Sequence, residues 1–220
     1  MENRLAYMRM LVAVFKVSRN PQKTQAIFDL GEALHAMGAT KGILKRFQDD
    51  PEGQKAIDSR KWMGRINLSE LQALPPGTLG RVYSTHMLEN KLDPEFFRQM
   101  RVEDSTAFVL MRMRQCHDLW HVMTGFDISN LGEIGLQAFM MAQIAAPLSM
   151  VILSGGLFRL GTQKQEFVDS FMEAFLTGWQ MGKRSKRIFG VDWEANWTTP
   201  VVELRKTYQV EAVNQIALDS

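Results

Sequence analysis

Apolar residues recur every three or four positions along almost the whole chain, with polar residues between them. This spacing is typical of amphipathic α-helices that bury one face. No run alternates apolar and polar residues at every second position, as a half-buried strand would. The pattern therefore predicts an all-α fold, a single-domain multi-helix bundle over residues 1–220.

The N-terminal part of the chain is predicted to form four helices, over residues 3–17, 21–37, 42–48 and 52–60. Pro21 suits the first turn of the second helix, and Gly38 follows its last apolar residue, where glycine commonly ends a helix. Residues 62–77 are predicted to be mostly irregular. They close with Leu-Pro-Pro-Gly, which we interpret as a connection inside one domain, and a further helix is expected from residue 78.

The middle of the chain contains two predicted helices joined by a short turn. The first begins at Asp104 or Ser105, either of which can cap it, and runs to residue 123. The second begins at Ser129 or Asn130 and carries Glu133 in its first turn. A carboxylate there is stabilised by the positive end of the helix dipole.

Residues 134–158 carry almost no charge and are predicted to form a long apolar central helix, kinked near Pro147. Their length would also permit a membrane-spanning helix. Gln137, Gln143 and the pair Gly155-Gly156 interrupt the apolar run. We therefore expect a buried helix that lines an apolar cavity or a subunit interface, with the membrane-spanning helix as the alternative.

A further helix is predicted over residues 163–184 and a closing one over residues 200–208. The first ends in four cations within residues 183–187. Cations at this position complement the negative end of the helix dipole and are often only solvated. The alternative is that they contact a phosphate group or an anionic membrane surface.

Composition narrows the class of protein. The 220 residues are 45% hydrophobic, which allows a substantial core, and the net charge of +2 is too small to indicate a nucleic-acid partner. Cys116 is the single cysteine, so we expect a buried thiol in a reducing compartment. Residues 1–17 show no convincing targeting segment, and the mature protein is expected to begin there.

The strongest chemical signal is His117-Asp118-Leu-Trp-His121, followed after eleven residues by Glu133. On a helix with about 100° per residue, His121 lies about 40° and Asp118 about 100° around the axis from His117. The three side chains therefore share one face, and a turn with Gly125 could fold Glu133 back as a fourth group. Such mixed nitrogen and oxygen donors suit zinc, iron or manganese. Asp118 either binds the metal or orients a histidine that does.

Other interpretations of these residues stay open. In the zinc-protease motif His-Glu-x-x-His the carboxylate acts as a base, whereas the shorter side chain of Asp118 favours coordination or bracing of a ligand. Alternatively, His117 and Asp118 are ordinary side chains on a helix that bind no metal, with Asp118 paired to Arg114. His35 and His86 lack carboxylates at ligand spacing, so we expect them to be ordinary structural or solvated histidines.

The motif resembles the signature of the coenzyme Q (ubiquinone) biosynthesis family known as the fourth Coq protein. The likeness extends to four further stretches, which are Leu74-Pro75-x-Gly77-Thr78-Leu79-Gly80-x-x-Tyr83, Asn20-Pro21 through Leu30-Gly31-Glu32, Gly132-Glu133, and Trp197-x6-Leu204-Arg205. The resemblance therefore covers nearly the whole chain.

This resemblance implies an all-helical metalloprotein that associates peripherally with membranes. Its implied reaction is oxidative decarboxylation at ring carbon 1 of a polyprenylated hydroxybenzoate, with His117, Asp118, His121 and Glu133 as metal ligands and catalytic residues. Zinc is the implied metal, with iron, manganese or magnesium as alternatives. The alternative function is a non-catalytic, prenyl-lipid-binding scaffold that organises a quinone biosynthesis complex around a structural metal. A third interpretation is a metal-dependent hydrolase of prenyl phosphates.

An isoprenoid tail requires a long apolar slot, because each buried methylene contributes about 0.8 kcal/mol. The candidate substrate-contacting residues are Met140, Met141, Ile144, Phe167, Phe171, Phe175, Lys183 and Arg184. Expected partners are a prenylated aromatic or other isoprenoid lipid, the membrane surface, other quinone biosynthesis proteins and a second copy of the chain in a homodimer. A bacterial protein would be cytoplasmic and peripheral to the membrane, and a eukaryotic one would lie on the matrix face of the mitochondrial inner membrane.

Overall fold

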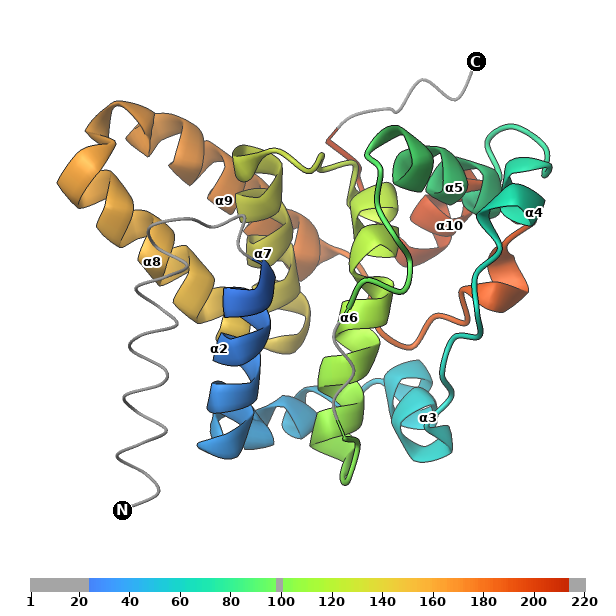
Figure 1. The fold of residues 1–220 in the computed structure, drawn as a ribbon, viewed down its shortest axis with the longest axis horizontal. Helices are drawn as coiled ribbons and strands as arrows, with labels where there is room; N and C mark the ends of the chain where they lie inside the picture. Colours follow the sequence, from blue (N-terminus) through green and yellow to red (C-terminus); the bar gives the residue numbers. More distant parts are fainter. Residues whose placement is uncertain (1–23, 98–100, 214–220) are drawn as a thin grey trace. The chain divides into compact units, whose positions relative to one another are not determined.

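The computed structural model describes residues 24–97 and 101–213, and within these ranges every regular element is helical (Figure 1). The elements are α2 (Thr24–Ala36), η1 (Ala39–Phe47), α3 (Pro51–Ser59), α4 (Leu68–Gln72), α5 (Leu79–Glu89), α6 (Ser105–Thr124), α7 (Asn130–Ile144), α8 (Pro147–Gln163), η2 (Gln165–Phe167), α9 (Val168–Arg184), η3 (Glu194–Asn196) and α10 (Val201–Tyr208). The η elements are 3-10 helices. The all-α prediction is confirmed, whereas the helix expected over residues 3–17 lies outside the described residues.

Helix ends follow the capping signals in the sequence. Asp104 accepts a hydrogen bond from the backbone of Ala107 at the start of α6, and Ser129 does the same for Gly132 at the start of α7. Gly125 adopts the left-handed conformation, with φ of 76°, directly after α6. The segment 62–77, predicted to be mostly irregular, contains the short helix α4, whose first turn is capped by Asn67.

The chain divides into two compact units. Residues up to 48 and residues 129–183 form the first, and residues 49–128 with residues 184 onward form the second. The expectation of a single domain stays a prediction.

The prediction of one long apolar central helix over residues 134–158 is wrong. Ala145 adopts a left-handed conformation with φ of 53°, and its N–H closes α7 on the carbonyl of Met141. Pro147 has no N–H to continue a helix, but it suits the first position of the new helix α8. The apolar run therefore forms two helices with a break where a kink was expected. No helix in the described part of the chain is long and apolar enough to cross a membrane.

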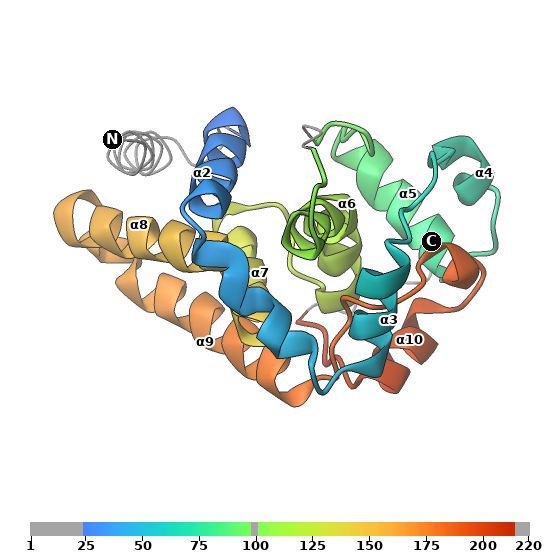
Figure 2. The ribbon, with the colours of Figure 1, turned by 90° about the horizontal axis from the view of Figure 1, so that it is seen from below.

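In the first unit, α7, α8 and α9 lie side by side (Figures 1 and 2). The approach of α9 to α7 depends on glycine, because a Cβ atom on Gly178 would lie within 1.9 Å of the carbonyl oxygen of Gly135. One turn later, a Cβ atom on Gly182 would meet the carbonyl oxygen of Phe139 at 2.7 Å. The core of this unit includes the buried residues Ala138, Leu153, Leu160 and Phe171.

In the second unit, α3, α5 and α10 pack against α6, which Figure 2 shows nearly end-on. Two buried arginines hold the surrounding chain to this helix. Arg112, on α6, donates to the carbonyl oxygens of Phe189, Val191 and Lys61 at 2.7–3.1 Å. Arg205, on α10, donates to the carbonyl oxygens of Val122 and Met123 in the last turn of α6.

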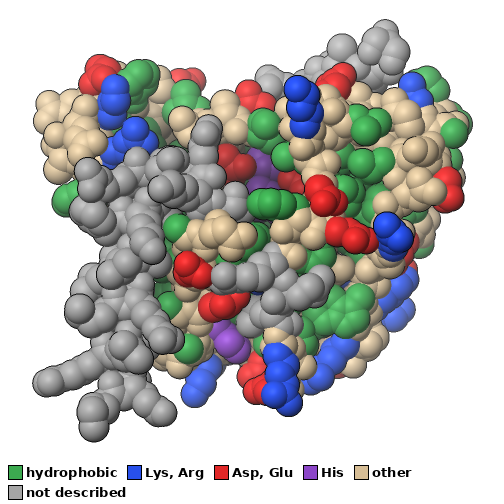
Figure 3. Space-filling model, in the orientation of Figure 1, with side chains coloured by type: hydrophobic (Ala, Val, Ile, Leu, Met, Phe, Trp, Pro, Cys, Tyr) green, Lys and Arg blue, Asp and Glu red, His purple; other side chains and the backbone are tan. Residues whose placement is uncertain are grey.

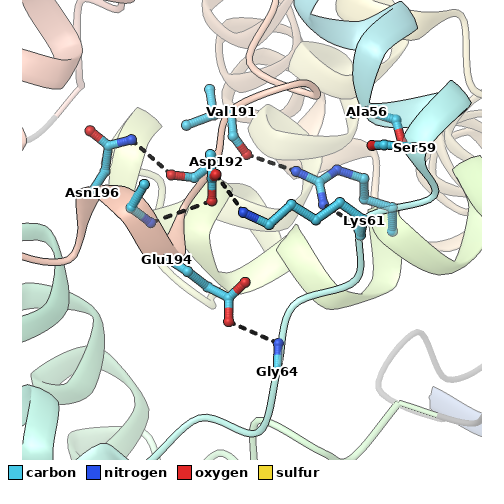
Figure 4. A network of polar contacts seen from close by, with 10 residues as sticks. Ala56, Ser59, Lys61, Gly64, Val191, Asp192, Glu194 and Asn196 are labelled. Carbon is cyan, nitrogen blue, oxygen red and sulfur yellow. Dashed lines mark hydrogen bonds and ion pairs between the residues drawn. The ribbon is translucent and has the colours of Figure 1, made fainter.

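Figure 4 shows how the segment after α3 is attached to the segment before α10. Lys61 pairs with Asp192, and the backbone N–H of Gly64 donates to Glu194 at 2.9 Å. Asn196 closes the same loop by donating to the carbonyl oxygen of Asp192. The contacts of Lys61 and Gly64 join residues 131 and 130 positions apart, and with the arginine contacts they fix the chain around α6.

Candidate metal centre

The candidate site is formed within α6. One potential ligand atom from each of His117, Asp118 and His121 lies within 4.8 Å of the others. The predicted shared helix face is confirmed, because positions i, i+1 and i+4 bring these side chains together without help from a distant segment. This is the only group of three such side chains that could hold a metal ion in the described part of the chain.

The ring of His121 is buried and oriented by the turn that follows the helix. Its Nδ1 atom lies 2.8 Å from the carbonyl oxygen of Phe126. A carbonyl oxygen can only accept, so Nδ1 carries the proton and donates. The lone pair is then on Nε2, which is the arrangement that a metal-ligating histidine needs.

His117 and Asp118 lie at the edge of the site, each with a side chain that is 29% exposed. Their Nδ1 and Oδ1 atoms are 3.6 Å apart. Burial by itself would raise the pKa of Asp118, but the hydrogen bond and charge of His117, with His121 and His86 nearby, lower it below its usual value. Figure 3 shows histidine side chains next to acidic ones on the face of the molecule that it draws.

These donors fit a divalent metal ion. Ligand atoms at about 2.0–2.2 Å from a tetrahedral zinc ion lie about 3.3–3.6 Å from one another. The 3.6 Å separation of His117 and Asp118 matches that spacing, and the ligand atoms of the whole trio lie within 4.8 Å of one another. Two imidazole nitrogens and one carboxylate oxygen are donor types that zinc, iron and manganese all accept.

Glu133 lies in the first turn of α7, as predicted, and is partly buried. This helix belongs to the other compact unit. The assignment of Glu133 as a metal ligand therefore stays a prediction.

The second helix at the site is α5, which sequence reasoning did not connect with the motif. His86 lies against His121, with ring centroids 5.7 Å apart and planes inclined by 26°. Burial lowers the pKa of His86, and His121 lowers it further. Tyr83, one turn earlier, has its pKa raised by burial and then by the negative charge of Asp118. The local sequence around His86 contains no signal for this contact, because the two histidines are 35 positions apart.

The remaining histidine and the cysteine have other surroundings. His35 contacts the hydroxyl of Thr40 at 3.0 Å, in the first unit. Cys116 is buried, as predicted, and burial raises the pKa of its thiol.

The residues predicted to contact the lipid substrate differ in solvent exposure. Met140, Ile144 and Phe171 are buried, Met141 and Phe175 are half-buried, and Phe167 is 48% exposed. Lys183 and Arg184 are exposed at the end of α9. All eight lie on or next to α7 and α9, and their contact with a substrate stays a prediction.

Together, the helical fold and the donor trio define an all-α protein with a candidate metal centre built into one helix. The sequence profile of the family described as "Coenzyme Q (ubiquinone) biosynthesis protein Coq4" matches residues 4–214. The chain belongs to this family, which takes part in ubiquinone biosynthesis.

Individual relatives agree with this assignment. The chain is 28% identical over 197 residues to a protein of Danio rerio named "Ubiquinone biosynthesis protein COQ4 homolog, mitochondrial", with 88% of this chain and 72% of that protein covered. The Mus musculus protein of the same name is 29% identical over 191 residues, covering 85% and 71%. A crystal structure of a candidate ubiquinone biosynthesis protein from Nostoc punctiforme superposes with a TM-score of 0.83 at 28% identity, covering 94% of this chain and 99% of that one.

Proposed function

We propose that this protein catalyses the metal-dependent oxidative decarboxylation of a polyprenylated hydroxybenzoate at ring carbon 1. The observation that carries the proposal is the convergence of His117, Asp118 and His121 within 4.8 Å, with the tautomer of His121 set by the carbonyl of Phe126. Membership of a ubiquinone biosynthesis family supports the choice of a quinone precursor as the substrate.

The chemistry follows from the donor set. A bound divalent cation would act as a Lewis acid toward the carboxylate or phenolate of the substrate. The bond from ring carbon 1 to the carboxylate would break with its electron pair left on the ring, and carbon dioxide would leave. One atom of dioxygen would become the new hydroxyl, and the other would leave as water with two electrons and two protons from an external two-electron reductant. Iron or manganese suits oxygen chemistry better than zinc. His121, His117 and Asp118 hold the ion, and Glu133 is the proposed fourth ligand and proton carrier.

The surface of the first unit supports a lipid-facing role. Several large apolar side chains on α8, η2 and α9 are exposed, namely Met150, Leu157, Phe158, Phe167, Val168, Met172 and Leu176. Phe158 is 67% exposed, which is unusual for an aromatic side chain without a partner surface. We propose that these residues contact the prenyl tail or the membrane, with Lys183 and Arg184 toward anionic headgroups.

The same proposal includes the expected partners and location. The protein would act peripherally at the membrane that holds its prenylated substrate, as a homodimer and beside other quinone biosynthesis proteins. The eukaryotic relatives are named mitochondrial.

The decisive experiment measures product formation from a short-tailed prenyl-hydroxybenzoate by protein loaded separately with zinc, iron or manganese. His117→Ala and Glu133→Gln should abolish turnover while the circular-dichroism spectrum is unchanged. His35→Ala, a histidine outside the second unit, is the matched control and should retain activity. Undiminished product from His117→Ala would overturn the proposal.

A prenyl-lipid-binding scaffold is the second candidate, favoured by the exposed apolar side chains of α8 and α9. In that case purified protein binds the prenylated acid without converting it, whichever metal is supplied. Removal of the metal should then lower the melting temperature strongly, because the metal would be structural.

A further inference from the structure

His86 has a buried ring nitrogen, and its ring lies against that of His121, a member of the candidate metal-binding trio. Its Nε2 atom is shielded from solvent and has no hydrogen-bond partner within the described residues. The ring lies 5.7 Å from that of His121, which in turn lies 4.9 Å from that of His117. A buried polar atom without a partner costs free energy, so such an atom beside a candidate site indicates a missing ligand group.

The protonation of His86 follows from its neighbour Asn90. The Asn90 side-chain nitrogen donates to the carbonyl oxygen of His86 at 2.8 Å, which identifies it as the NH₂ group. The same nitrogen lies 3.4 Å from Nδ1 of His86. An NH₂ group can only donate, so Nδ1 accepts and the ring proton is on Nε2.

This tautomer separates His86 from the metal ligands. A ligating nitrogen must offer a lone pair, and on Nε2 of His86 the proton occupies that place. The side chain is also absent from the trio whose ligand atoms lie within 4.8 Å of one another. The Nε2–H group is therefore a donor in need of an acceptor.

We propose that His86 Nε2–H donates a hydrogen bond to a carboxylate oxygen of the aromatic acid held at the metal centre. The inference rests on the proposed function and adds a substrate-binding residue from α5 to the ligands from α6. A carboxylate fits because one oxygen can face the cation while the other accepts from the N–H group. His86 would thereby fix the orientation of the carboxylate relative to the aromatic ring.

The test measures binding of 3-geranyl-4-hydroxybenzoate to zinc-loaded protein by calorimetry. His86→Phe keeps an aromatic ring against His121 but removes the donor, and should weaken binding about 10- to 100-fold. His86→Gln restores an N–H group and should recover part of the affinity. His35→Phe is the matched control and should bind as the wild type does. 2-Geranylphenol, which lacks the carboxylate, should bind wild type and His86→Phe equally.

Zinc affinity of the same variants, measured by competition with a chelator, separates this inference from the proposed function. His86→Phe should bind zinc as tightly as the wild type, because His86 is not a ligand. Unchanged binding of the acid by His86→Phe, or an equal loss for 2-geranylphenol, would overturn the inference. A large loss of zinc affinity would also overturn it, because His86 would then be a ligand. If His121→Ala keeps its zinc and its turnover, the proposed function fails instead.

Discussion

The Nδ1 atom of His121 donates to the carbonyl oxygen of Phe126 across the turn that ends α6, at 2.8 Å. The backbone of this turn thus determines which ring nitrogen can bind a metal. Gly125 makes the turn with φ of 76°, a conformation that is costly for residues with a Cβ atom.

Gly125→Ala should therefore weaken metal binding without touching a ligand. We expect a loss of about 1–2 kcal/mol in the free energy of unfolding and zinc binding weakened about 10-fold or more, because the carbonyl of Phe126 would shift. Urea denaturation and chelator competition measure the two effects. Gly125→Asn is the control, because asparagine tolerates this conformation and should lose less. Equal zinc affinity in wild type and Gly125→Ala would contradict the proposed role of the turn.

Arg205 is expected to stabilise the same end of α6. Its guanidinium donates to the carbonyl oxygens of Val122 and Met123 at 2.8 and 3.0 Å. These two carbonyl groups lie in the last turn of α6, where the helix itself offers them no N–H partner. Arg205→Met should lower the free energy of unfolding by about 2–4 kcal/mol, because two buried carbonyl groups lose charge-assisted donors. Arg205→Lys keeps the charge and should cost less. Denaturant midpoints within error of the wild type for Arg205→Met would refute this expectation.

Gly178→Ala should be among the most damaging substitutions in the first unit. The added methyl group would overlap the backbone of Gly135. Backbone atoms within a helix cannot rotate away from it, as the end of a flexible side chain could. We expect a loss of about 3 kcal/mol or more from overpacking. Gly161→Ala is the matched control, since a Cβ atom there meets nothing within 4 Å and alanine favours a helix. Thermal melts of both variants test the difference, and similar melting temperatures would show that α9 can move away from α7.

Tyr208 should make stability depend on pH at the alkaline end. Burial, followed by the charge and hydrogen bond of Glu52, raises the pKa of Tyr208 to about 12 from 10.0. The unfolded chain therefore loses this proton first, and the stabilisation present below pH 10 is lost as the pH rises toward 12. The group is only partly buried, so the loss should be about 1 kcal/mol after allowance for solvent screening.

The measurement is the difference in unfolding free energy between wild type and Tyr208→Phe at several pH values. This difference should shrink between pH 10 and pH 12, because the variant has no hydroxyl to ionise. Glu52→Gln, which removes the neighbouring charge, should reduce the same slope. A difference that stays constant over this range would argue against the raised pKa.

Local signals in the sequence located most of the helices. Asp104 and Ser129 cap α6 and α7 as predicted, because a side-chain oxygen at this position satisfies backbone N–H groups of the first turn. The short helix α4 was missed among residues 62–77, although Asn67 and Glu70 provide a capping signal there. Five residues contain too few apolar positions to show a helical period.

The break between α7 and α8 was also not predictable from apolar periodicity. Residues on both sides of Ala145 are equally apolar, and an alanine ordinarily favours a helix. Its left-handed conformation ends α7, and Pro147 then begins a second helix. Hydropathy describes how much of a segment is buried, but the direction of the chain depends on which surfaces meet.

The sequence by itself determined the all-α fold and the trio His117, Asp118 and His121, because helical geometry alone brings positions i, i+1 and i+4 to one face. Only the tertiary structure decided what surrounds the trio. The carbonyl of Phe126 orients His121, Arg205 holds the end of the helix, and His86 arrives from α5 with a buried N–H group. These contacts join residues distant in the chain or depend on backbone conformation, so no spacing rule encodes them.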